Sequence, residues 1–173
     1  MNAGSELWVQ VIAALHLLKT DPAGLKGAIF RVRAGPVRDS LAKEIRKLAG
    51  PVTRLHPNMS DEQLFGGIDV VATLQSGNLR RTKGLFERQG WFELTMAERC
   101  DLYTAARISQ ALDQRQIFPL IVCEEGSDEE KLPDSLKARL ACSFDMSELA
   151  YSDTDFPYIC LLYTSPSPRD YTR

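Results

Sequence analysis

Residues 33–40 come nearest, in residue type, to a phosphate-binding turn. They read Arg-Ala-Gly-Pro-Val-Arg-Asp-Ser and follow a stretch typical of a β-strand. A phosphate cradle needs several free backbone N–H groups, glycines that allow close approach, a lysine, and a hydroxyl for magnesium. Here Gly35 stands alone, Pro36 removes a donor, and the Asp39 carboxylate repels phosphate. We therefore expect a degenerate phosphate loop, with Gly35 and Arg38 as the remaining candidate contacts.

Metal-binding residue types are present but poorly spaced for a site. The four cysteines are Cys100, Cys123, Cys142 and Cys160. They form no Cys-x-x-Cys pair, and His16 and His56 are the two imidazoles in the sequence, so no zinc motif results. Five carboxylates gather within residues 124–130, but neighbouring loop carboxylates repel one another and normally face water. We expect no metal site.

Composition places the chain among globular proteins of ordinary domain size. It has 173 residues, of which 44% are hydrophobic and 25% charged, and its net charge is -2. This balance excludes collagen-like and disulfide-built classes and gives no general attraction to nucleic acid. The most apolar stretch, residues 7–18, is interrupted by Gln10 and is too short to cross a bilayer, and no basic leader precedes it. We expect a cytoplasmic protein.

Patterns typical of strands and helices alternate along the chain. Expected helices cover residues 6–19, 37–48, a short segment capped by Ser60 or Asp61, 97–112 and 134–140; expected strands cover 27–33, 52–55, 91–95, 117–123 and 142–144. The nearly continuous apolar run 117–123 is typical of a strand buried on both faces of a parallel sheet. We therefore expect a three-layer α/β domain with a mainly parallel sheet.

Residues 76–90 interrupt this alternation. They are rich in glycine and in cations, and Arg80, Arg81, Lys83 and Arg88 form a local basic patch. We expect an exposed loop or hairpin here.

Three segments together resemble a known family. Besides the turn at 33–40, they are Leu-Phe-Gly-Gly-Ile-Asp-Val-Val-Ala-Thr-Leu-Gln-Ser-Gly at 64–77 and Gly-Leu-Phe-Glu-Arg-Gln-Gly-Trp-Phe-Glu-Leu-Thr-Met-Ala-Glu at 84–98. Over nearly all of residues 6–150 the chain resembles the N-terminal AAA+ module of the magnesium chelatase D subunits, in the form found in bacteriochlorophyll-making bacteria. The resemblance implies a P-loop NTPase-like AAA+ core.

The same resemblance implies that no catalytic set is intact. The P-loop lysine and hydroxyl residue of the family's ATP-hydrolysing partner would fall on Arg38 and Asp39, and its Walker B acids on Thr95 and Met96. Residues 124–127 offer no sensor asparagine. These replacements cannot hold magnesium or orient an attacking water. The resemblance therefore implies a module that does not hydrolyse ATP.

Partners and a single surviving functional residue also follow from the resemblance. In this family the magnesium chelatase complex inserts Mg²⁺ into protoporphyrin IX at the expense of ATP, in (bacterio)chlorophyll biosynthesis. An AAA+ ATPase subunit turns over ATP, a porphyrin-binding subunit carries the substrate, and the family's own member is a platform in a ring-shaped hetero-oligomer. ATP and Mg²⁺ are used by the complex, and no cofactor is assigned to this chain. Arg139 matches an arginine that acts in trans as an arginine finger.

Two alternative interpretations remain open at this stage. One is an active AAA+ ATPase of the chelatase/MoxR-like group with a divergent P-loop. The other is an unrelated α/β interaction domain. The first alternative makes the chain an enzyme, and the second does not.

Residues 160–173 resemble translated sequencing-adapter DNA. Cys-Leu-Leu-Tyr-Thr-Ser followed by Pro-Ser-Pro-Arg-Asp is the translation of a transposase-based sequencing adapter, TGT CTC TTA TAC ACA TCT and CCG AGC CCA CGA GAC. We therefore expect residues 1–159 to form the AAA+ core and 160–173 to be a disordered, non-native tail. The family's C-terminal lid, acidic linker and integrin-I-like domain would then lie beyond Ile159.

Overall fold

The computed structural model describes residues 3–125 and 130–149. Its α-helices are α1 (Ala3–Thr20), α2 (Pro22–Leu25), α3 (Pro36–Ala49), α4 (Asp61–Phe65), α5 (Val70–Ser76), α6 (Leu102–Asp113) and α7 (Asp134–Lys137), and its short 3-10 helices are η1 (Leu85–Glu87) and η2 (Ala97–Arg99). The strands are β1 (Gly27–Arg31), β2 (Val52–Leu55), β3 (Trp91–Thr95), β4 (Leu120–Glu124) and β5 (Cys142–Asp145).

The strands form one parallel sheet in the order β2-β3-β4-β1-β5. Strand β1 lies between β4 and β5, with Gly27 beside Leu120 and Ala28 beside Cys142. Each step from one parallel strand to the next requires a crossover, and helices supply these crossovers. The mainly parallel α/β sheet expected from the sequence is confirmed.

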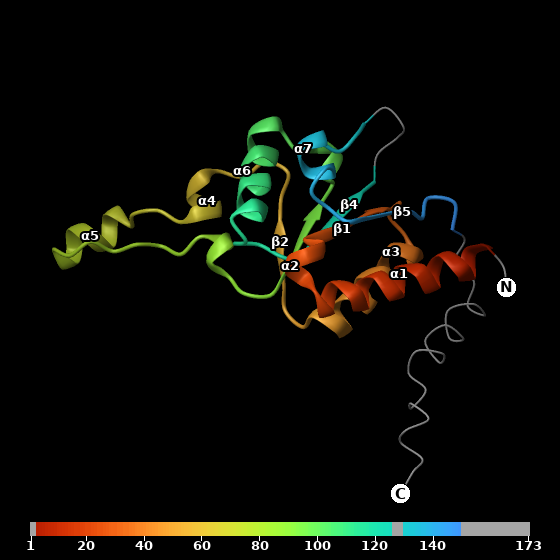
Figure 1. Cartoon of the computed structure of the whole chain (residues 1–173). Helices are drawn as coiled ribbons and strands as arrows, with labels where there is room; N and C mark the ends of the chain where they lie inside the picture. The colour runs from red at the N-terminus through yellow and green to blue at the C-terminus, as the bar shows by residue number, and fades with distance from the viewer. Residues whose placement is uncertain (1–2, 126–129, 150–173) are drawn as a thin grey trace, which may run out of the picture.

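Helices cover both faces of this sheet (Figure 1). On one face, α1 and α3 pack over a cluster that includes Leu15, Phe30 and Leu41. On the other face, α4, α6 and α7 contribute to a second cluster, which includes Ile108 and Leu136. The first four residues of β4 alternate between the two clusters, Leu120 and Val122 in one and Ile121 and Cys123 in the other, so these four positions are apolar. This explains the continuous apolar run and confirms the three-layer arrangement.

Local hydrogen bonding moves several element boundaries from their expected positions. Helix α6 begins five residues later than the pattern suggested, because the Asp101 carboxylate accepts a 2.6 Å hydrogen bond from the Thr104 N–H and caps the helix there. The preceding Met96 has a left-handed backbone, φ 52°, which separates η2 from β3. Strand β4 begins after Pro119, which has no N–H to donate to a neighbouring strand.

Residues 66–84 form a projection from the body, which we call the arm (Figure 1). It leaves the body after α4, carries α5 at its far end and returns to η1. An isolated antiparallel bridge joins Ile68 to Arg81 near its base. The sequence predicted an exposed loop or hairpin over residues 76–90. Residues 76–83 are exposed as expected, but η1 follows and buries Phe86, and the arm contains a helix, α5, that the prediction lacked.

Two further expectations concern membrane-spanning helices and the C-terminal segment. Within the part that the structure describes, no helix is both long and apolar enough to span a bilayer. The segment 160–173, expected to be a non-native tail, lies outside the described residues.

Candidate functional site

The turn between β1 and α3 lies where parallel α/β sheets usually bind ligands. Strands β1 and β4 are neighbours, yet the chain leaves β1 toward one face through α3 and reaches α7, on the other face, after β4. Ligands bind at such divergences, beyond the carboxyl ends of the strands. The Val32 N–H donates a 2.9 Å hydrogen bond to the Glu124 carbonyl and holds the two strand ends together. The turn that contains Gly35 therefore lies at the carboxyl end of β1, beside the end of β4.

The turn itself has an open backbone but unsuitable chemistry. Gly35 is the N-cap of α3, with φ 147°, and its Cα faces open space. Pro36 begins the helix and contributes no N–H, and Asp39 places a carboxylate in the first helical turn. A helix N-terminus attracts anions because its backbone N–H groups give it a partial positive charge. Here the negative charge of Asp39 offsets that partial charge. The turn therefore combines one missing backbone donor with a carboxylate in the first helical turn.

Arg38 is engaged by a protein carboxylate. Its guanidinium forms an ion pair with the Glu125 carboxylate, and both side chains are partly buried. The Glu125 backbone N–H in turn donates a 3.2 Å hydrogen bond to the Glu98 carboxylate. Sequence reasoning named Arg38 but missed Glu98 and Glu125 as its surroundings, because the acidic run after β4 suggested solvated side chains. The pair links the first turn of α3 to the end of β4.

The expected Walker B positions carry no carboxylate. Thr95 is the last residue of β3, beside Cys123 of β4, and Met96 follows in the left-handed turn. The nearest acid of β3 in sequence, Glu93, forms an ion pair with Arg54. Residues 126–127, part of the segment in which the family resemblance would place a sensor asparagine, lie outside the described residues. The last residue of β3 and the residue after it thus carry no carboxylate.

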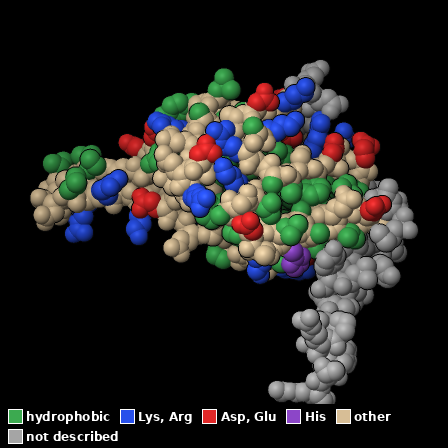
Figure 2. Space-filling model, viewed as in Figure 1, with side chains coloured by type: hydrophobic (Ala, Val, Ile, Leu, Met, Phe, Trp, Pro, Cys, Tyr) green, Lys and Arg blue, Asp and Glu red, His purple; other side chains and the backbone are tan. Residues whose placement is uncertain are grey.

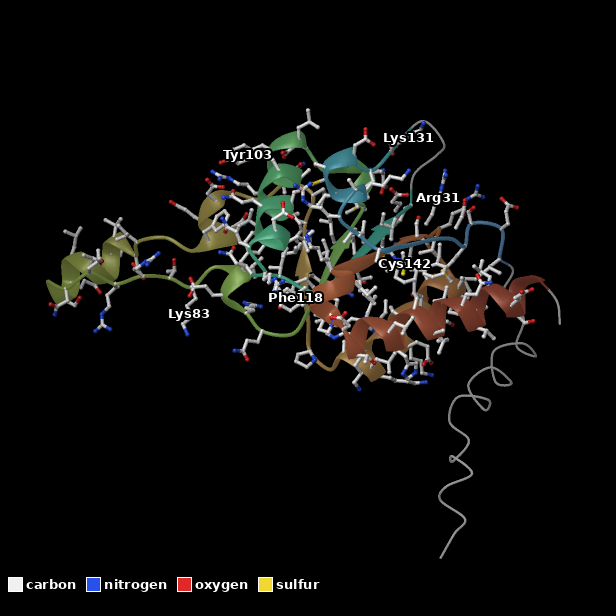
Figure 3. All side chains as sticks on the ribbon, in the orientation of Figure 1. Arg31, Lys83, Tyr103, Phe118, Lys131 and Cys142 are labelled. Atoms are coloured by element: carbon white, nitrogen blue, oxygen red, sulfur yellow. The ribbon has the colours of Figure 1, made fainter. Side chains whose placement is uncertain are left out.

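Charged groups of both signs line a cavity of about 330 Å³ at the same end of the sheet. Its lining residues are Arg31, Glu124, Glu130, Lys131, Leu132, Asp134 and Lys137. Figure 3 labels Arg31 and Lys131 at this end of the molecule. Burial raises the pKa of Glu124, and the positive charge of Arg31 partly offsets this rise. No group of three described His, Cys, Asp or Glu residues is placed to hold a metal ion, and residues 126–129 of the acidic run lie outside the description.

Arg139 lies at the opposite end of the sheet. It follows α7 and precedes β5, so it is at the amino ends of the strands. Its guanidinium donates to the Asp113 carboxylate at 2.7 and 2.9 Å and to the Ser135 carbonyl at 2.7 Å. Lys26 also donates to Asp113, at 3.2 Å, and these hydrogen bonds hold the pKa of Asp113 below its usual range. The structure does not bring Arg139 together with Gly35 and Arg38.

Comparison with known proteins gives two curated relatives. No protein-family model matches the chain. The magnesium-chelatase 60 kDa subunit of Cereibacter sphaeroides is 42% identical over 148 residues, which are 85% of this chain and 26% of the relative. The protein of the same name from Rhodobacter capsulatus is 41% identical over 143 residues, 82% of this chain and 26% of the relative. The chain therefore spans about a quarter of the length of these relatives.

A solved structure supports the fold alone. A candidate ATPase from Cytophaga hutchinsonii superposes with a TM-score of 0.52 and 13% identity, over 95% of this chain and 57% of that one. The family resemblance predicted from the motifs at 64–77 and 84–98 is confirmed at the level of sequence. The chain thus shares the parallel α/β fold of that ATPase and is similar to a segment of the magnesium-chelatase 60 kDa subunit.

Proposed function

We propose that this chain is a non-hydrolysing AAA+ platform module of magnesium chelatase. In this role it assembles in the cytoplasm with the AAA+ ATPase subunit and the porphyrin-binding subunit of the complex. The complex inserts Mg²⁺ into protoporphyrin IX in (bacterio)chlorophyll biosynthesis. The similarity to two magnesium-chelatase 60 kDa subunits supports the choice of complex.

The ion pair between Arg38 and Glu125 is the observation that carries the non-hydrolysing part of the proposal. Arg38 stands where an ATPase of this fold places the lysine that reaches the phosphates. Breaking a partly buried ion pair costs free energy, because it leaves the other charge uncompensated. A phosphate that binds Arg38 must therefore displace Glu125 and replace that interaction. Any phosphate would also approach the carboxylates of Glu125 and Asp39.

The residues present do not fit bound Mg–ATP. The turn has a single glycine, one donor fewer at Pro36, and an acid where a magnesium ligand of the hydroxyl type is needed. Thr95 and Met96 supply no carboxylate for the ion or for the attacking water. We therefore derive no hydrolytic step at this turn, and we assign ATP and Mg²⁺ to the ATPase partner.

Calorimetric titration tests this proposal directly. The chain is titrated first with Mg–ATP and then, in the same cell, with the purified ATPase partner, while that partner alone serves as the nucleotide-binding control. We expect no nucleotide binding with a Kd below about 1 mM, and we expect binding of the ATPase partner. Clear Mg–ATP binding would instead support the divergent, active ATPase. Absence of binding to the ATPase partner would remove the platform role.

A matched variant asks whether the ion pair is the cause. Glu125→Gln keeps the shape of the side chain and removes its charge, which frees Arg38. We expect this variant to bind Mg–ATP more tightly than the unchanged chain while Asp39 keeps the affinity weak. If neither protein binds Mg–ATP and the fold of the variant is unchanged, the glycine-poor backbone, rather than the ion pair, prevents nucleotide binding.

A further inference from the structure

The arm is a hydrogen-bonded structure and not a loose loop. At its base the Thr82 N–H donates to the Gly67 carbonyl at 2.9 Å, and the Asp69 N–H donates to the Arg80 carbonyl at 2.8 Å. Nearer the tip the Arg80 N–H donates to the Thr73 hydroxyl at 3.0 Å. These bonds fix the returning strand against α5 and fix which side chains face outward.

The outward side chains at the end of the arm are apolar. Four of them are 61–80% exposed: Val70, Val71, Leu74 and Leu79. Ile68, nearer the base, is 58% exposed. Figure 2 shows hydrophobic side chains gathered along one side of the projecting end, with cations along the other side. Scattered exposed leucines are ordinary, but a cluster on a projection marks an interaction surface.

Charge separates the arm from the rest of the chain. Residues 66–84 contain three cations, Arg80, Arg81 and Lys83, and one acid, Asp69, which gives the arm a net charge of +2. Because the whole chain carries -2, the remainder carries -4. A basic projection on an acidic body is electrostatically complementary to a second copy of the same chain.

The body offers a matching surface at the start of α6, which we call the α6 patch. Leu102 is 80% exposed and Tyr103 is 55% exposed. Three acids are near in sequence or by contact: Asp101 precedes Leu102, Asp61 accepts a hydrogen bond from Tyr103, and Glu62 follows Asp61 in α4. Tyr103 donates a 2.8 Å hydrogen bond to Asp61, so the patch joins α4 to α6. It combines exposed apolar side chains with carboxylates, whereas the arm combines exposed apolar side chains with cations.

One neighbouring cation belongs to the patch and is already paired. Arg107 donates to Asp61 at 3.0 Å and to the Tyr103 hydroxyl at 2.9 Å, and its guanidinium lies over the Phe65 ring. This network neutralises Asp61 but leaves Glu62 and Asp101 without a cation among the ion pairs of the described residues. The patch therefore stays acidic toward an approaching surface.

We propose that the arm of one copy docks on the α6 patch of a second copy. The apolar end of the arm covers Leu102 and Tyr103, and the arm's cations approach Glu62 and Asp101. The two surfaces differ, so the contact is heterologous, and its repetition builds a ring or an open chain of modules. The inference deepens the proposed assembly role, on which it rests for its place in a ring.

Sedimentation of the chain at rising concentration, up to about 1 mM, tests this contact. We expect the average mass to rise with concentration for the unchanged chain. Leu74→Glu in the arm and Leu102→Glu in the patch should each weaken association at least tenfold, because each buries a charge in the contact. Leu17→Glu, at a 57% exposed leucine of α1, is the matched control and should leave association unchanged.

Mixing the two variants gives the decisive result. Leu74→Glu retains a working patch and Leu102→Glu retains a working arm, so the mixture should form a dimer that neither variant forms alone and should stop there. Failure of the mixture to associate would overturn the head-to-tail contact, as would a chain that stays monomeric at every concentration.

A second readout separates a protein partner from a lipid surface. A monomeric chain that pellets with phosphatidylglycerol-containing vesicles, and loses this with Leu74→Glu, would assign the arm to membranes and overturn the proposal. Neither nucleotide nor the ATPase partner is present in these experiments. Their failure is therefore distinguishable from failure of the platform role, which the calorimetric titration tests.

Discussion

At the residue scale, Cys123 shows how burial near the candidate site sets a measurable pH dependence. Burial raises the pKa of its thiol to about 12, and the neighbouring Glu93 charge acts in the same direction. Between about pH 9 and pH 12 the unfolded chain has lost this proton while the folded chain keeps it. The free energy of unfolding should therefore fall as pH rises, by up to about 1.4 kcal/mol per pH unit from this group.

Urea unfolding at a series of alkaline pH values measures this slope. Cys123→Val removes the thiol while keeping a small apolar side chain, so its stability should decline less steeply with pH than that of the unchanged chain. The comparison of slopes is independent of any constant cost of the substitution. Identical slopes would show that the thiol ionises equally in the folded and unfolded states.

Residue identities predict a weak phosphate turn, and this stays a prediction, but they did not predict the ion pair beside it. Gly35, Pro36 and Asp39 can be judged from their types, because donor loss and charge are local properties. Arg38 and Glu125 are 87 residues apart, and their contact depends on β1 and β4 being neighbours. Only the three-dimensional arrangement shows which carboxylate the arginine meets.

At the element scale, periodicity predicted the existence of helices and strands better than their ends. The ends depend on caps, as at Asp101, and such capping residues are only one signal among several in the sequence. The base of the arm depends on two glycines from separate segments. A Cβ on Gly66 would collide with the Thr82 carbonyl, and one on Gly84 would collide with the Leu64 carbonyl. This explains why the two glycine-containing motifs occur together.

Gly66→Ala should therefore loosen the arm while leaving the sheet intact. Gly66 has φ 79°, which costs an alanine about 1–2 kcal/mol, and the collision with Thr82 adds to this cost. We expect amide hydrogen exchange to accelerate at Asp69 and Thr82 but not in β4. Gly77→Ala is the matched control, since φ is 66° there but nothing lies within 4 Å. Equal loss of protection in both variants would mean that backbone conformation alone decides the effect.

At the scale of the whole molecule, the parallel sheet separates two candidate regions whose relative positions the sequence does not reveal. All strands run in the same direction, so the phosphate turn after β1 and Arg139 before β5 are at opposite ends of the sheet. The alternation of strand and helix patterns predicted the sheet, but the strand order arises from packing between distant segments. Arg139 therefore cannot act on the chain's own turn, and any role in hydrolysis must cross an interface.

Arg139→Ala tests that role in an assembly with the ATPase partner. An arginine supplied in trans is worth about 10³–10⁵ in kcat for phosphoryl transfer, so we expect the ATP turnover of that partner to fall at least tenfold. The fold should tolerate the change, because Asp113 keeps its ion pair with Lys26 at 3.2 Å. Arg139→Lys keeps the charge but loses the forked geometry and should give an intermediate rate. Unchanged turnover with unchanged binding of the ATPase partner would leave Arg139 as the structural partner of Asp113.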